Sequence, residues 1–124
     1  MRGYFGPIEE LTLANTNFRQ VLYTGPKAQL VLMTLQPGEE IGAEVHEDHD
    51  QFFRFEHGEG KVVVGDDEWE VTDGDAVIVP AGANHNVINT SKDQPLKLYT
   101  IYSPPEHADG TIHKTKADAM AAEH

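Results

Sequence analysis

The side chains most able to do chemistry gather in one short segment. Glu44, His46, His49 and Gln51 fall within eight residues of a stretch that otherwise has the composition of a strand. His85 follows a turn rich in glycine and proline further along the chain. The chain has no cysteine, so a metal would have to bind imidazole, carboxylate or amide groups. These five residues predict a metal site.

The elements that must position these residues are short strands. From Asn17 onward, apolar runs alternate with turn signals about every eight to twelve residues, which is typical of a sandwich or barrel. The expected strands are residues 18–23, 29–35, 45–55, 61–64, 69–71, 76–79, 86–90 and 96–102. The sequence therefore predicts an all-β domain.

Strand alternation indicates where the chain must bend near the candidate ligands. Successive side chains point to opposite faces, so Glu44 and His46 share one face while Gln51 would belong to the other. If both His46 and Gln51 face one ion, a turn or bulge is required between them, and the acidic residues 47–50 are the expected place. Regular geometry would point His49 away from His46.

Composition limits the partners and the organisation. With 9 Lys and Arg against 21 Asp and Glu, the formal charge of -12 opposes nucleic acid and anionic membranes. No apolar run is long enough for a leader or a membrane span, so we expect a cytoplasmic protein. With nucleic acid and membranes disfavoured, the expected partner of the metal site is a small-molecule substrate. We expect an N-terminal arm over residues 1–16, a barrel over 17–103, and a tail over 104–124 with a short helix from Lys116 to about Glu123.

A second motif gives these residues a family resemblance. Gly74, Pro80, Gly82, His85 and Asn89 match in full the pattern glycine, five residues, proline, one residue, glycine, two residues, histidine, three residues, asparagine. This pattern resembles the second motif of the cupin superfamily, in particular the small single-domain cupin-2 proteins described as mannose-6-phosphate-isomerase-like. The resemblance implies a double-stranded β-helix, or jelly-roll barrel, with a short C-terminal helix added here.

The first cupin motif is only partly matched. Gly38, His46 and Gly58 agree with it, but Glu44 stands where an imidazole is usual and Gln51 where a carboxylate is usual. The resemblance implies Glu44, His46, Gln51 and His85 as ligands, with His49 as the alternative to Glu44. Two imidazoles, one carboxylate and one amide favour manganese, iron or zinc, with nickel as a further option.

The resemblance also implies a function. We expect a divalent ion acting as a Lewis acid on an oxygenated, carbohydrate-like substrate in an isomerase-type reaction; a metal-dependent dioxygenase and a non-catalytic ligand-binding or sensor cupin are the alternatives. Tyr102, on the last expected strand, is the candidate proton donor. Small cupins pair, so a homodimer is expected, with the N-terminal arm as a contact. Only Arg54 and Lys61 are basic within the motif regions, which argues against a phosphorylated substrate.

Overall fold

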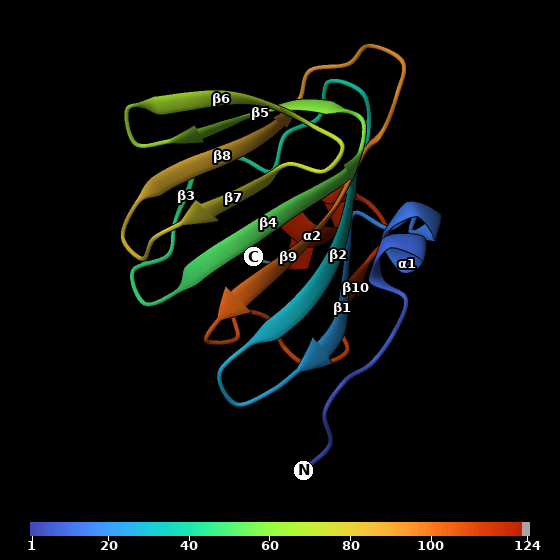
Figure 1. Ribbon diagram of the computed structural model, residues 1–124, viewed down its shortest axis with the longest axis vertical. Coiled ribbons are helices and arrows are strands. Elements are labelled where there is room, and N and C mark those ends of the chain that lie inside the picture. The colour runs from blue at the N-terminus through green and yellow to red at the C-terminus, as the bar shows by residue number, and fades with distance from the viewer. Residues whose placement is uncertain (123–124) are drawn as a thin grey trace.

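Two antiparallel sheets face each other in the computed structural model, which describes residues 1–122 (Figure 1). The larger sheet has the strand order β10-β1-β2-β9-β4-β7, and the smaller has the order β3-β8-β5-β6. The strands are β1 (Arg19–Thr24), β2 (Gln29–Leu35), β3 (Glu44–Val45), β4 (Asp50–His57), β5 (Glu59–Val64), β6 (Asp67–Thr72), β7 (Ala76–Val79), β8 (Asn84–Asn89), β9 (Leu96–Ser103) and β10 (Ile112–His113). Helices α1 (Ile8–Ala14) and α2 (Lys116–Ala122) flank them.

This architecture confirms the expected all-β barrel with a short C-terminal helix. Thr115 caps α2 as its sequence indicates, because its Oγ1 accepts a hydrogen bond of 3.1 Å from the backbone N–H of Asp118. Glu123, the expected end of this helix, and His124 lie outside the described residues. The expected strand over residues 45–55 is two strands, β3 and β4, separated by a turn at Glu47 and Asp48.

The core lies between the two sheets and follows from strand alternation. Along β4, Gln51, Phe53 and Phe55 are buried while the residues between them are partly exposed, as predicted. Strand β9 alternates in the same way. The largest fully buried apolar side chains, from both sheets, are Met33, Leu35, Phe53, Phe55, Val62, Val87, Leu96 and Leu98.

Helix α1 was not expected, and it changes the interpretation of the N-terminal arm. It covers part of the outer face of the larger sheet, where Leu32 and Thr34 of β2 are buried although they point away from the core cluster. The Asn15 carbonyl accepts a hydrogen bond of 2.9 Å from Thr34 Oγ1, and the Lys97 ammonium donates to the same carbonyl. The arm therefore packs on its own sheet, and the homodimer stays a prediction.

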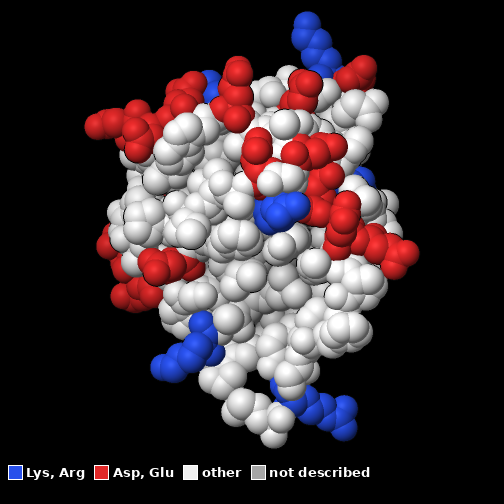
Figure 2. Space-filling model, in the orientation of Figure 1, with Lys and Arg blue, Asp and Glu red and all other residues white. Residues whose placement is uncertain are grey.

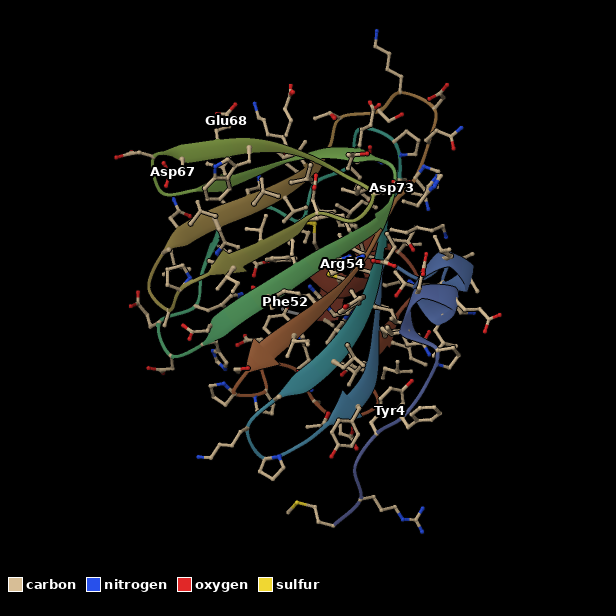
Figure 3. The ribbon with its side chains drawn as sticks, viewed as in Figure 1. Tyr4, Phe52, Arg54, Asp67, Glu68 and Asp73 are labelled. Atoms are coloured by element: carbon tan, nitrogen blue, oxygen red, sulfur yellow. The ribbon has the colours of Figure 1, made fainter. Side chains whose placement is uncertain are left out.

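The outer surface is acidic at its margins. Figure 2 shows Asp and Glu gathered along the top and sides of this face, with mostly uncharged side chains at its centre. Figure 3 places Asp67 and Glu68 at the β5–β6 hairpin, and Phe52 and Arg54 on β4. Phe52 and Arg54 alternate with the buried residues of β4 and so face away from the core.

Among residues 1–122, no helix is long and apolar enough to cross a membrane.

Two of the matched motif residues have a purely structural role. Gly58 has φ of +104°, and a Cβ there would lie 2.5 Å from the Pro95 carbonyl oxygen, so any other residue would force the backbone apart. Asn89 is almost fully buried. Its Nδ2 donates to the carbonyls of Leu35 and Gln94 at 3.1 and 2.9 Å, and its Oδ1 accepts from the Ser91 N–H at 2.9 Å. Asn89 thus ties the end of β8 to β2.

We predict that Asn89→Asp lowers the free energy of unfolding by about 3 kcal/mol or more, because a buried carboxylate cannot donate to the two carbonyls. Asn84→Asp on the same strand, where the side chain is exposed, serves as the matched control and should change stability by less than about 0.5 kcal/mol. Urea unfolding measures both. Equal losses of stability in the two variants would contradict the structural role of Asn89.

Candidate metal centre

Cross-strand pairing brings the candidate ligands together at one end of the barrel. Glu44 of β3 lies directly opposite His85 of β8 in the antiparallel register. His46 follows β3, and its carbonyl accepts a hydrogen bond of 2.9 Å from the Gly82 N–H in the turn before His85. The chain then turns at Glu47 and crosses to the larger sheet as β4. The bend expected at residues 47–50 is confirmed.

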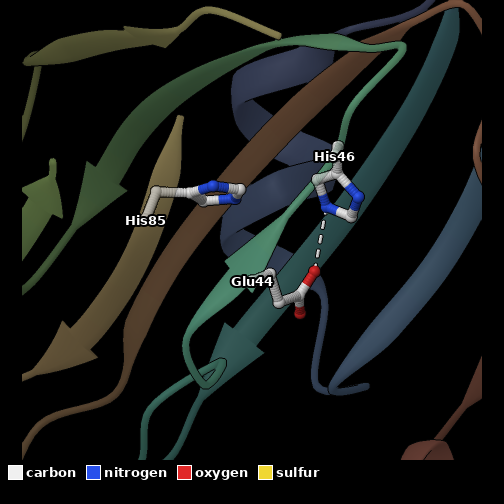
Figure 4. A group of neighbouring side chains, drawn as sticks. All are labelled: Glu44, His46 and His85. Atoms are coloured by element: carbon white, nitrogen blue, oxygen red, sulfur yellow. Dashed lines mark ion pairs between the residues drawn. The ribbon is translucent and has the colours of Figure 1, made fainter. Parts of the chain in front are cut away.

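Three side chains converge within reach of a single ion. One ligand atom each from Glu44, His46 and His85 lies within 4.8 Å of the other two (Figure 4). Glu44 Oε2 and His46 Nε2 are 2.9 Å apart, yet the buried Nε2 has no hydrogen-bond partner of acceptable geometry among the described residues. Adjacent ligands of a six-coordinate ion with bonds of about 2.1 Å lie about 3 Å apart, so the spacing suits a shared ion.

The surroundings of His85 prepare one ring nitrogen for a metal. Nδ1 lies 3.1 Å from the Ala83 carbonyl, to which it donates, so that Nε2 carries the free lone pair. Burial lowers the pKa of His85, with a smaller contribution from the charge of His46. The imidazole is therefore neutral at neutral pH, as a metal ligand must be.

Glu44 and His46 stabilise each other's charged forms. Contact with the Glu44 carboxylate raises the pKa of His46, against a smaller opposing effect of burial. Burial acts to raise the pKa of Glu44, but the neighbouring His46, followed by Arg19 and His85, lowers it overall. An ion that binds these two side chains would therefore compete with a proton at His46.

Gln51 of β4, in the larger sheet, has one side-chain acceptor without a hydrogen-bond partner among the described residues. Its Nε2 donates a hydrogen bond of 3.0 Å to Thr100 Oγ1 on the neighbouring strand β9. Its buried Oε1 has no hydrogen-bond partner among residues 1–122. A buried acceptor without a partner is costly, and a cation would satisfy it. The Gln51 amide oxygen is therefore available as a metal ligand, which is the role expected for Gln51 from the sequence.

His49 lies in a second cluster rather than with Glu44 and His85. It shares this cluster with His46 and Glu106, and its Nδ1 lies 3.3 Å from Glu106 Oε2. His49 Nε2 lies 3.0 Å from the Pro105 carbonyl. The geometry therefore favours Glu44 over His49 as the partner of His46 and His85. His49 lies next to His46, in the cluster that includes Glu106.

Tyr102 lies inside the barrel, close to the candidate ligands. Its ring centroid is 5.8 Å from that of His46, and its hydroxyl lies 3.3 Å from His107 Nε2. Burial raises the pKa of Tyr102 well above its ordinary value, so the hydroxyl keeps its proton at neutral pH. Burial also lowers the pKa of His107 to about 4, which leaves His107 a neutral acceptor for that proton.

Sequence reasoning missed two residues that the fold brings to this end of the barrel. Glu106 comes from the tail after β9, and its Oε2 lies 3.7 Å from His46 Nδ1. Arg19 of β1 is buried, and its Nη1 lies 3.2 Å from Nδ1 of His113 on β10. The signal available for Glu106 was its position just after two prolines that end a strand. Arg19 carried no signal, because it lies outside both motifs.

Comparison with known proteins agrees with this geometry. The cupin domain model matches residues 31–102. The crystal structure of BH2720 from Bacillus halodurans is 48% identical with a TM-score of 0.94, covering 97% of this chain and 95% of that chain. KdgF from Halomonas sp. is 22% identical with a TM-score of 0.66, covering 71% of this chain and 80% of that one, a likeness that shows the fold alone.

A protein of Bacillus subtilis (strain 168) is also similar in sequence. YrkC is 50% identical over 122 residues, which cover 94% of this chain. The chain spans 65% of the length of YrkC. The family match covers more than half of the chain and includes every candidate ligand. The chain therefore belongs to the cupin family.

Proposed function

We propose that this cupin binds one divalent metal ion through Glu44, His46, Gln51 and His85, and that it acts on a small oxygenated, carbohydrate-like substrate in an isomerase-type reaction. The observation that carries the proposal is the convergence of Glu44, His46 and His85 within 4.8 Å. The buried acceptor of Gln51 and the buried Nε2 of His46, both without hydrogen-bond partners among the described residues, support the same site. Manganese, iron and zinc suit this donor set best, with nickel next.

Four side-chain ligands would leave coordination positions on the ion open for a substrate. When bound, a divalent ion held by four side chains supplies a Lewis acid that polarises a carbonyl or hydroxyl oxygen of the substrate. Isomerisation of a hydroxy-carbonyl compound also requires a proton to move between neighbouring carbons. The protein must therefore provide groups that accept and donate a proton beside the ion.

Groups suited to that proton transfer line the same end of the barrel. The Glu106 carboxylate lies between His46 and His49 and is partly exposed, so it can accept a proton from a substrate that enters there. Tyr102 keeps its hydroxyl proton, and it could exchange its hydrogen bond to His107 for one to a substrate oxygen. We assign Glu106 as the base and Tyr102 as the donor. We use the family description mannose-6-phosphate-isomerase-like for this class of reaction only, and we do not propose a phosphorylated substrate.

The ligand assignment predicts which histidines the metal needs. His46→Ala and His85→Ala should each lower the affinity for Mn²⁺ or Zn²⁺ by about a hundredfold or more, since each removes a direct ligand. His49→Ala should keep the metal, and His57→Ala on β4 serves as a control outside both clusters. Elemental analysis after dialysis against limiting metal gives the stoichiometry. Loss of metal in His49→Ala, or full loading of His85→Ala, would contradict the assignment.

Proton competition at His46 predicts a pH dependence. Contact with Glu44 raises the pKa of His46 above its ordinary value of 6.5. Below that raised pKa the ion must displace a proton, so affinity should fall by about tenfold for each unit that the pH decreases. Above it, affinity should level off. Titrations with Mn²⁺ between about pH 5.5 and 8 measure the slope, and an affinity that does not vary with pH would show that His46 is not a ligand.

Proton exchange tests the reaction class even when the product has not been identified. The metal-loaded protein should exchange the α-proton of at least one α-hydroxy aldehyde or ketone with D2O, as followed by ¹H NMR over a panel of sugars and sugar acids. Glu106→Gln should slow this exchange by about a hundredfold while metal content is unchanged. Glu47→Gln, an exposed carboxylate in the nearby turn, is the control. Oxygen consumption without α-proton exchange would instead favour a dioxygenase.

A further inference from the structure

Arg19 is an unusual side chain for the interior of a barrel. It is 4% exposed, and its Nε is buried without a hydrogen-bond partner among residues 1–122. The guanidinium makes one polar side-chain contact, between Nη1 and His113 Nδ1 at 3.2 Å, and no ion pair within the described residues. A buried guanidinium without a carboxylate partner is costly, because desolvation is not offset by attraction to an opposite charge.

A pocket of about 200 Å³ gives Arg19 access to a ligand. Its wall includes Arg19, Glu44 and the half-buried Lys116 of α2. Phe18 and Ala119 supply apolar surface to the same wall. Glu44 is also the carboxylate of the candidate metal centre, so the pocket and the metal centre share a side chain. A molecule in this pocket would therefore lie close to one of the candidate metal ligands.

The local charge is opposite to that of the rest of the protein. Arg19, Lys116 and Glu44 are the charged residues among those that line the pocket, and together they carry a charge of +1. A divalent ion on Glu44 would make this end more positive still, in a chain with a formal charge of -12. Behind the larger effects of burial and of the Glu44–His46 contact, Arg19 also contributes to the pKa values of Glu44, His46, Tyr102 and His107. The charge of Arg19 therefore affects the pKa values of several residues of the candidate site.

We propose that Arg19 binds the carboxylate of the substrate, so that the substrate is a small carboxylate-bearing molecule such as a sugar acid, held between Arg19 and the metal centre. This inference rests on the proposed function. The planar guanidinium presents paired donors that match a carboxylate, and His113 Nδ1 accepts a hydrogen bond from Nη1. The ligand would supply the carboxylate contact that Arg19 lacks among residues 1–122.

A carboxylate suits this pocket better than a phosphate. A single buried guanidinium balances one negative charge, whereas a phosphate monoester carries close to two. The carboxylates of Glu44 and Glu106 lie at the same end of the barrel and would repel the additional charge. Lys116 is on the short helix α2 and is partly exposed, so it adds attraction rather than a fixed contact.

Thermal shift with matched ligands tests the proposal apart from activity. The probes are acetate, glycolate and D-glucuronate, with D-glucose as the neutral counterpart of glucuronate and inorganic phosphate as the alternative anion. Each is added to Mn²⁺-loaded and to EDTA-treated protein. The variants are Arg19→Met, Arg19→Lys, and Arg54→Met, which removes an arginine on the outer face of β4. Manganese content is measured in parallel and tests the proposed function separately.

At least one carboxylate should raise the melting temperature of the wild type and of Arg54→Met, while D-glucose does not. Arg19→Met should keep its manganese and weaken carboxylate binding by about tenfold or more, with Arg19→Lys in between. Equal shifts in wild type and Arg19→Met would overturn the proposal. So would the absence of any carboxylate shift in the wild type, or a shift with phosphate alone. Failure of the wild type to bind manganese would overturn the metal centre instead.

Discussion

The candidate site depends on the register between β3 and β8. Strand β3 has only two residues, but the segment before it runs along β8 through backbone hydrogen bonds from Asn89 N–H to the Glu39 carbonyl at 2.8 Å and from Ile41 N–H to the Val87 carbonyl at 2.9 Å. This alignment sets Glu44 opposite His85. A shift of one residue would turn Glu44 to the other face of the sheet and separate the two ligands. The geometry of the metal centre is therefore a consequence of strand pairing.

Packing between the sheets then determines the electrostatics. Gln51, Tyr102 and His85 are almost fully buried at one end of the barrel, and His46 beside them is partly exposed. Desolvation lowers the pKa of His85 and raises that of Tyr102, while contact with Glu44 raises the pKa of His46. Burial likewise leaves the Arg19 guanidinium, which is 4% exposed, without an opposite charge in contact among the described residues. Metal and substrate would each neutralise a group that folding alone leaves uncompensated.

Much of the fold and part of the site can be predicted from the sequence, because both follow local rules. Alternation of apolar residues predicts the inward faces of β4 and β9, and strand parity predicts the turn between His46 and Gln51. The contributions of Arg19 and Glu106 could not be predicted, since they depend on how β1 and the tail pack against strands distant in sequence. Helix α1 was missed because its seven residues make only about two turns, too few for a helical period to stand out.

X-ray absorption spectroscopy at the metal edge of the Mn²⁺- or Zn²⁺-loaded protein tests the central claim most directly, because it reports the ligands rather than the consequences of binding. The account predicts a five- or six-coordinate ion with two imidazole ligands and oxygen in the remaining positions, and the loss of one imidazole in His85→Ala. A shell made only of oxygen would place the metal on surface carboxylates. A shell with three imidazoles would bring His49 into the site. Either result would contradict the site described for Glu44, His46, Gln51 and His85.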